Sequence, residues 1–134
     1  MIILNSNETN YKPYKKNSDY SYTLGTFPTL ELIQSKKENI KCVYVHSKYN
    51  GSVNISDICK NNNIELRYSD KTINRISTKD NCMIIGVFNK YICTLNNQKP
   101  HVLLVNPSDM GNMGTIIRSS VGFNISNLII ISPG

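Results

Sequence analysis

The sequence predicts an α/β protein built in two parts. Stretches with helical spacing of apolar residues alternate along the chain with short apolar segments rich in β-branched residues. A polar connector that ends at Pro100 separates a basic portion from a nearly neutral one. The length of 134 residues fits one domain, or one small domain plus part of another, and 40% hydrophobic with 18% charged residues is typical of a globular protein.

Residues 1–19 show neither helical nor strand periodicity, and we expect them to form an extended arm. Lys12, Lys15 and Lys16 lie there among tyrosines, of which Tyr14 is one. Basic and aromatic side chains interleaved in this way contact phosphates and stack on unpaired bases in many single-stranded RNA complexes. These four residues are therefore candidate RNA contacts, although packing of the tyrosines onto their own domain explains the pattern equally well.

Residues 20–92 predict one compact domain of three helix–strand pairs, an α/β sandwich. The helices are expected after Gly25, after a cap at Asn54 or Ser56, and from Asp70 or Thr72 onward. Each helix precedes an apolar, β-branched strand, and these strands are expected at residues 40–46, 64–68 and 82–88.

Residues 93–100 are expected to form a linker, and residues 101–134 a second unit. The second unit reads as a strand over 101–105, a glycine-bearing loop, a helix over 112–122 and a strand over 128–131. Such a βαβ unit has parallel strands. With only one helix to cover them, these strands should lie partly exposed unless something else packs on them.

Arg118 is the chemically distinctive residue of this unit, because it is the only charged residue after Asp109. A guanidinium is costly to bury alone, so Arg118 must meet water, an acid or an anion. Asn112 is expected to cap the helix, while Gly111 and Gly114 let the backbone approach a neighbour or ligand. The GxGxxG and Walker spacings are absent, which disfavours a dinucleotide or nucleoside triphosphate site.

The excess of positive charge lies in the first part of the chain. All but one of the 15 Lys and Arg residues and all but one of the 9 Asp and Glu residues precede residue 101, and the net charge is +6. This asymmetry favours a polyanionic partner for the first part, while a merely soluble basic surface explains it as well.

Membrane, secreted and metal-binding classes find no support in the sequence. The apolar runs are far shorter than the roughly 18 residues of a transmembrane helix, and the N-terminus lacks the features of a signal peptide. We therefore expect a cytoplasmic protein. No metal-ligand spacing joins the cysteines, which we expect to be buried free thiols: Cys42, Cys59, Cys82 and Cys93.

Residues 101–131 resemble the first signature motif of the SpoU/TrmH family of RNA methyltransferases. In that family a strand leads to the pattern Asn-x-Gly-x-x-x-Arg at the start of a helix, and here Asn112, Gly114 and Arg118 carry it. A small residue, an aromatic residue and a further apolar strand follow, as Gly122, Phe123 and the segment 128–131 do here.

Residues 20–88 resemble, more weakly, the ribosomal-protein-like substrate-binding domain that precedes the catalytic domain in many members of that family. Gly25 and Gly86 fall on its characteristic glycines. Leu24 and Ile85 depart from it, since a Glu and a Gln usually precede those glycines. The resemblance implies a three-layer α/β/α domain followed by the first β-α-β unit of a knotted SPOUT methyltransferase domain.

The resemblance also implies an activity, which is methyl transfer from S-adenosylmethionine to a ribose 2′-hydroxyl of tRNA or rRNA by a homodimer. Arg118 would contact the RNA and assist deprotonation of the hydroxyl, with Asn112 beside it in the catalytic motif. The family's later motifs, which supply most of the cofactor pocket, are not in this sequence, so the cofactor-binding residues are expected beyond Gly134. We therefore expect the natural protein to be longer, and this chain alone to bind RNA without methylating it.

A second interpretation remains open. The alternative is a non-catalytic RNA-binding module with the ribosomal-protein-like fold, in which the terminal unit serves for dimerisation. The charge asymmetry fits both interpretations.

Overall fold

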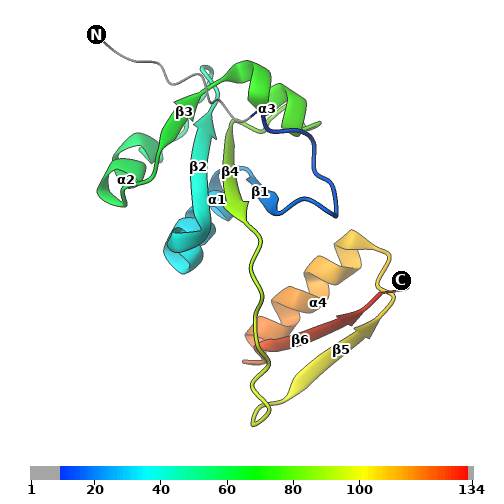
Figure 1. Cartoon of the computed structure of the whole chain (residues 1–134). Coiled ribbons are helices and arrows are strands. Elements are labelled where there is room, and N and C mark those ends of the chain that lie inside the picture. The colour runs from blue at the N-terminus through cyan, green and yellow to red at the C-terminus, as the bar shows by residue number, and fades with distance from the viewer. Residues whose placement is uncertain (1–9, 133–134) are drawn as a thin grey trace. The chain divides into compact units, whose positions relative to one another are not determined.

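A computed structural model describes residues 10–132 of the chain (Figure 1). The chain forms two compact units, Met1–Tyr91 and Ile92–Gly134. The described residues contain two sheets and four α-helices, which confirms the predicted α/β class.

The boundaries of these units differ from those expected from the sequence. The arm expected over residues 1–19 belongs to the first unit, and the linker expected over residues 93–100 belongs to the second, which starts at Ile92 instead of His101. Two expectations lie outside the described residues. One is the part of the arm at residues 1–9, and the other is the set of cofactor-binding residues, which are expected beyond Gly134.

The first unit is built on a four-stranded sheet in the order β1-β4-β2-β3. The strands are β1 (Tyr20–Leu24), β2 (Ile40–Val45), β3 (Leu66–Tyr68) and β4 (Ile84–Asn89). Strand β4 runs antiparallel to both β1 and β2, whereas β2 and β3 are parallel. The last strand of the unit is therefore bonded on both sides and joins its first strand to the rest of the sheet.

Three α-helices connect these strands: α1 (Thr26–Lys36), α2 (Ile55–Asn61) and α3 (Asp70–Ile76), with a short 3-10 turn at Lys37–Asn39 after α1. The Asn54 side chain caps α2 by accepting a hydrogen bond from the backbone N–H of Asp57, as expected. Helix α3 begins at Asp70, one of the two starts expected for it. Ser69 caps that helix by accepting from the N–H of Thr72, because its backbone is extended and its hydroxyl can reach the free N–H group.

The sheet of the first unit lies between two layers, each with its own core. On one face, Ile33 of α1 and Cys59 of α2 pack with buried residues of β2 and β4 such as Val43 and Ile84. On the other face, Ile73 of α3 packs with a second group: Tyr11, Cys42, Tyr44, Ile76, Cys82, Ile85 and Val87. Helices α1 and α2 thus cover one face, and α3 together with the segment around Tyr11 covers the other.

Strand β1 was missing from the expected order of elements, and this is a correction. Tyr20 and Tyr22 stand at alternate positions on it, and their rings meet edge to face with centroids 5.7 Å apart. Both rings pack against the core that contains Tyr11. The alternation of large and small residues over β1 is typical of a half-buried strand. It was not recognised in the sequence because the tyrosine-rich pattern of the arm runs directly into it.

Gly86 of β4 lies where a neighbouring side chain comes very close. Its N–H donates to the Thr23 hydroxyl at 3.1 Å, and a Cβ at Gly86 would overlap that same oxygen. The Thr23 hydroxyl also pairs with that of the fully buried Thr29 at 2.9 Å. The strand therefore needs a glycine here for space.

Replacing Gly86 by Ala should destabilise the first unit by about 1–3 kcal/mol, because the added methyl group overpacks a closed site. The free energy of unfolding from urea titration measures the effect. In the Gly86→Ala background, Thr23→Ser keeps the hydroxyl that clashes with the new methyl group, so it should recover little stability. Thr23→Ala in the same background removes that hydroxyl and should recover part of the lost stability. Equal stability of the Gly86→Ala variant and the parent protein would contradict the close approach.

The second unit contains two parallel strands, β5 (His101–Val105) and β6 (Asn127–Ile131), joined by helix α4 (Met110–Gly122). The parallel pairing confirms the predicted β-α-β unit. The expected loop was too long, since α4 begins at Met110, two residues before the predicted start at Asn112.

Apolar side chains of the second unit are largely open to solvent. Leu103 and Val105 of β5 are 54% and 68% exposed, and Ile130 and Ile131 of β6 are also exposed. Helix α4 has no buried residue. The expectation that these strands would be incompletely covered is met within the described residues.

The connector is attached to the second unit through one buried side chain. The Asn127 amide accepts a hydrogen bond from the N–H of Asn96 at 3.1 Å and donates to the carbonyl oxygen of Asn96, also at 3.1 Å. A longer contact of 3.4 Å reaches the carbonyl oxygen of Pro100. Asn127 therefore pairs with the connector as a strand neighbour would.

Two further expectations concern the whole chain. The four cysteines are free thiols, but Cys93 is exposed, so its predicted burial was wrong. It lies at the start of the linker expected over residues 93–100. Over residues 10–132, no helix combines the length and the apolar character that crossing a lipid bilayer requires.

Candidate functional site

Helix α4 starts at a carboxylate, and this fixes the position of the candidate catalytic residues. The Asp109 side chain accepts a hydrogen bond of 2.7 Å from the N–H of Asn112 and caps the helix. Asn112 is therefore the third residue of α4 and not its cap, which corrects the prediction. Asp109 is the cap because its backbone is extended at the point where the chain turns into the helix.

Arg118 consequently lies more than two turns into α4, further along than the sequence suggested. Its side chain folds back toward the start of the helix, as long side chains in helices do. The guanidinium Nη2 donates to the Thr115 hydroxyl at 3.4 Å, and a Cβ on Gly114 would lie 3.6 Å from Nη1. The guanidinium thus lies along the preceding turn, beside the bare backbone of Gly114.

The spacing Asn-x-Gly-x-x-x-Arg places the guanidinium over position 114 of α4, one turn before the arginine. A Cβ there would make an ordinary van der Waals contact with Nη1, so the space does not require a glycine. Gly111 and Gly114 both lie within the helix, and neither has a positive φ. The close approach to a neighbour or ligand expected of these glycines stays a prediction.

Arg118 is exposed, and its charge is not neutralised by a neighbouring acid within the described residues. The two ion pairs found among residues 10–132 join His46 to Asp70 and Arg67 to Glu65. Asp109 is occupied at the helix start. The single hydrogen bond of 3.4 Å to Thr115 is long, so the guanidinium has donors left for an anion.

A cleft of about 300 Å³ lies at the carboxyl end of β5, where ligands of parallel sheets commonly bind. Leu104 of the strand, Pro107 of the loop, and Asp109, Asn112 and Met113 at the start of α4 line it, among others. Arg118 is not one of the lining residues. The structure therefore places Asn112 in the cleft and Arg118 beside Gly114, and it does not bring the two side chains into contact.

The N-terminal arm is held against the first unit by its backbone. The Tyr22 hydroxyl donates to the carbonyl oxygen of Lys12, and the Lys90 ammonium donates to that of Lys16 at 2.8 Å. The carbonyl oxygen of Lys15 accepts from the N–H of Ser18 at 3.1 Å. The side chains of Lys12, Lys15 and Lys16 are exposed, so the arm presents three ammonium groups from an anchored backbone.

The tyrosines near the arm serve two different roles. Tyr11 is only 4% exposed, and its ring meets those of Tyr20 and Tyr44 edge to face, with centroids 5.1 and 6.2 Å away. Tyr14 is 56% exposed, with the Lys90 ammonium 4.9 Å from its ring centroid. Of the arm's two tyrosines, Tyr14 alone is placed to stack on a ligand, while Tyr11 packs the arm onto its domain.

The packing of Tyr11 gives the protein an expected sensitivity to alkaline pH. Burial raises the pKa of Tyr11 from 10.0 to about 12, because the phenolate would lose its hydration. A raised pKa in the folded state means that this contribution to stability is complete below pH 10.0 and is lost as the pH rises to about 12. In urea titrations across this range, Tyr11→Phe should lose stability less steeply than the parent protein, whereas the exposed control Tyr68→Phe should not differ from it.

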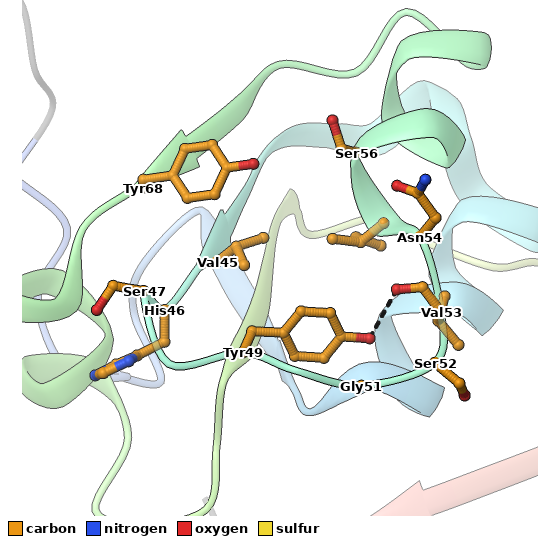
Figure 2. Close-up of a pocket in the computed structure, with 11 residues that line it drawn as sticks. Val45, His46, Ser47, Tyr49, Gly51, Ser52, Val53, Asn54, Ser56 and Tyr68 are labelled. Atoms are coloured by element: carbon orange, nitrogen blue, oxygen red, sulfur yellow. Dashed lines mark hydrogen bonds between the residues drawn. The ribbon is translucent and has the colours of Figure 1, made fainter.

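A cavity of about 550 Å³ in the first unit lies at the carboxyl end of β2 (Figure 2). The rings of Tyr49 and Tyr68 face it, and the Tyr49 hydroxyl donates to the carbonyl oxygen of Val53 at 2.9 Å. The His46 imidazole points away from both rings. Its Nδ1 accepts from the N–H of Lys48 at 3.1 Å and lies 3.6 Å from the Asp70 carboxylate, so His46 orders the loop after β2.

Sequence reasoning missed a second group of cations on the first unit. Arg67 at β3 and Lys71 and Arg75 of α3 line one polar cleft together with Tyr68. The available signal was the spacing of four residues between Lys71 and Arg75, which puts them on one side of a helix. Arg67 joins them only through the fold.

The first unit therefore carries two groups of cations, and the second carries Arg118. Each group is defined by contacts within its own unit. The sequence matches none of the protein-family models and none of the curated proteins with which it was compared, so the functional argument depends on these residues alone.

Proposed function

We propose that this chain belongs to an RNA methyltransferase of the SpoU/TrmH kind, which transfers a methyl group from S-adenosylmethionine to a ribose 2′-hydroxyl of tRNA or rRNA. The observation that supports it is Arg118, whose guanidinium lies exposed beside Gly114 with no acid paired to it in residues 10–132. The first unit, with a ribosomal-protein-like fold, binds the RNA. The second belongs to a knotted catalytic domain that works as a homodimer.

The chemical role of Arg118 follows from the properties of a guanidinium. A ribose hydroxyl must lose its proton to become a good nucleophile, and a fixed cation close to it stabilises the alkoxide that forms. The planar group can also hold the adjacent phosphate through two N–H donors. Because it stays protonated, Arg118 lowers the cost of ionising the hydroxyl and does not itself accept the proton.

The described residues do not form a site that fits the whole cofactor. The cleft at the end of β5 has about 300 Å³, at the lower limit of the roughly 300–1,000 Å³ of small-molecule sites. Of its polar residues, Asp109 already has its carboxylate bonded to the backbone N–H of Asn112 at the helix start. S-adenosylmethionine would supply the methyl group, and no step through it is assigned to these residues.

The test is to map ribose methylation in cellular RNA by mass spectrometry, with and without the gene for this protein. The proposal requires the loss of 2′-O-methyl groups from specific nucleotides of tRNA or rRNA and their return when the gene is restored. Identical methylation maps would reject the enzyme.

A non-catalytic RNA-binding module is the second candidate, and one observation favours it. The groups of cations on the first unit are built entirely from that unit's own contacts and need nothing from α4. An unchanged methylation map together with tight RNA binding by the protein would establish this second function.

A further inference from the structure

The second group of cations lines a polar cleft of about 350 Å³ on the first unit. Its walls come from the arm, β2, β3 and α3 and include Asn10, Tyr44, Arg67, Tyr68, Lys71 and Arg75. The lining residues include three cations and no acid. Glu65, which pairs with Arg67 from outside the lining, offsets one of these charges. The cleft is therefore suited to an anion.

Arg67 forms a fixed wall of this cleft. Its Nε and Nη2 donate to the two carboxylate oxygens of Glu65 at 2.9 and 3.1 Å, and its Nη1 donates to the Tyr44 hydroxyl at 3.1 Å. The hydrogen bonds from Arg67 lower the pKa of Glu65, so the pair is ionised. With three of its N–H donors occupied and its charge offset by Glu65, Arg67 shapes the wall of the cleft, and the positive charge without a paired acid comes from Lys71 and Arg75.

Arg75 and Lys71 provide the groups that can contact a ligand. Arg75 uses Nη1 for the Asn10 side chain and for the carbonyl oxygen of Tyr11 at 3.2 Å, and its other nitrogens have no partner among the contacts of the described residues. Lys71 lies one turn earlier on α3 and is exposed. An orientated guanidinium and a mobile ammonium thus stand side by side over the cleft.

Tyr68 adds an aromatic surface at the same place. Its side chain is 67% exposed, and it also faces the neighbouring cavity at the end of β2 (Figure 2). Through Tyr11, Arg75 is tied to the segment that carries Lys12, Lys15 and Lys16. The cleft therefore adjoins the arm at Asn10 and Tyr11 within one unit.

We infer that this cleft binds the backbone of single-stranded RNA, with Lys71 and Arg75 on a phosphodiester and Tyr68 stacked on a neighbouring base. Single-stranded RNA has regularly spaced phosphates with bases between them, and the cleft offers cations beside an exposed aromatic ring. A carboxylate ligand would use the cations but has no need of the ring. The inference rests on the proposal that the partner of the first unit is RNA, and it names the place where the RNA binds.

The experiment measures binding of a short, fluorescently labelled, unstructured RNA to the whole chain by anisotropy. Lys71→Glu should weaken binding about tenfold or more, and the slope of log affinity against log salt should become shallower by about 0.7 for each phosphate that the variant no longer binds. The matched control is Lys60→Glu, an exposed lysine on α2 away from the cleft, which should change affinity about twofold or less through general charge. Lys71→Arg should retain most of the affinity.

The stacking interaction has its own pair of variants. Tyr68→Ala should weaken binding by about fivefold or more, as loss of one base–aromatic stack does. Phe27→Ala, which removes another exposed ring of the same unit, should leave the affinity unchanged. Thermal unfolding of every variant checks that the fold is retained. Retention is expected for the two aromatic variants because Tyr68 and Phe27 are largely exposed to solvent.

The possible results separate this inference from the proposed function. If Lys71→Glu and Lys60→Glu lose affinity equally, or if Tyr68→Ala binds normally, RNA does not lie in the cleft, whatever the methylation maps show. Selective losses at Lys71 and Tyr68 support the cleft even where those maps are identical with and without the gene. Preference for an acidic peptide over RNA, or binding of neither, overturns the inference.

Discussion

In the full-length enzyme that the proposed function requires, replacing Arg118 by Ala should lower the rate of methyl transfer to RNA by about two to three orders of magnitude, the usual effect of removing a group that stabilises a developing oxyanion. The guanidinium has one long hydrogen bond, to Thr115, and no described acid shares its charge. Its loss therefore removes an interaction with the reacting ribose and phosphate and little else. Single-turnover rates at saturating RNA measure this step.

Two further variants make the result specific. Arg118→Lys keeps a positive charge but loses the planar pair of donors, so it should recover only part of the rate. Ser119→Ala changes the next exposed position of α4 and should leave the rate unchanged. The stability of all three variants should stay within about 0.5 kcal/mol of the parent, as for most surface positions. Full activity of Arg118→Ala would remove Arg118 from the mechanism.

Replacing Ile85 by Ala should destabilise the first unit by about 2–5 kcal/mol, enough to unfold a large part of a marginally stable domain. Ile85 lies on β4, which is bonded on both sides, and its side chain is fully buried in the core beneath α3. Truncating the side chain there leaves a cavity that rigid neighbours cannot fill. Urea unfolding followed by circular dichroism gives the free energy directly.

Ile84 provides a second measurement on the opposite face of the same strand. It is also fully buried, but it packs beneath α1 and α2. Ile84→Ala should cost a similar amount, and the double variant should cost about the sum if the two cores are independent. Asn89→Ala, at the exposed end of β4, is the control and should be neutral. A small loss at either isoleucine would contradict a sheet buried on both faces.

Most elements of the fold could be predicted because their signals are local. Pro28 near the start of α1, the β-branched run of β2 and the Asn54 cap of α2 each act within a few residues. Strand β1 could not be predicted in the same way. Its tyrosines are half-buried only because β4, from a distant part of the chain, pairs with it and Tyr11 packs on them.

The candidate site could be predicted only in part. Arg118 stands out in the sequence because the residues around it are uncharged, but its distance from the start of α4 depended on whether Asp109 or Asn112 capped the helix. Both residue types cap helices well, so composition does not decide between them. The cleft around Arg75 lay outside sequence reasoning because its walls come from three separate segments.

The insertion of Tyr11 into the core has a consequence for the thermodynamics of any ligand that Lys12, Lys15 and Lys16 bind. A flexible basic tail must surrender its conformational entropy at the moment of association, which weakens binding. Here the backbone of that segment is already tied down by Tyr11, Tyr22 and Lys90 when the protein folds. The conformational entropy of the segment is therefore lost when the protein folds and not when a ligand binds, so the segment behaves as a preorganised surface.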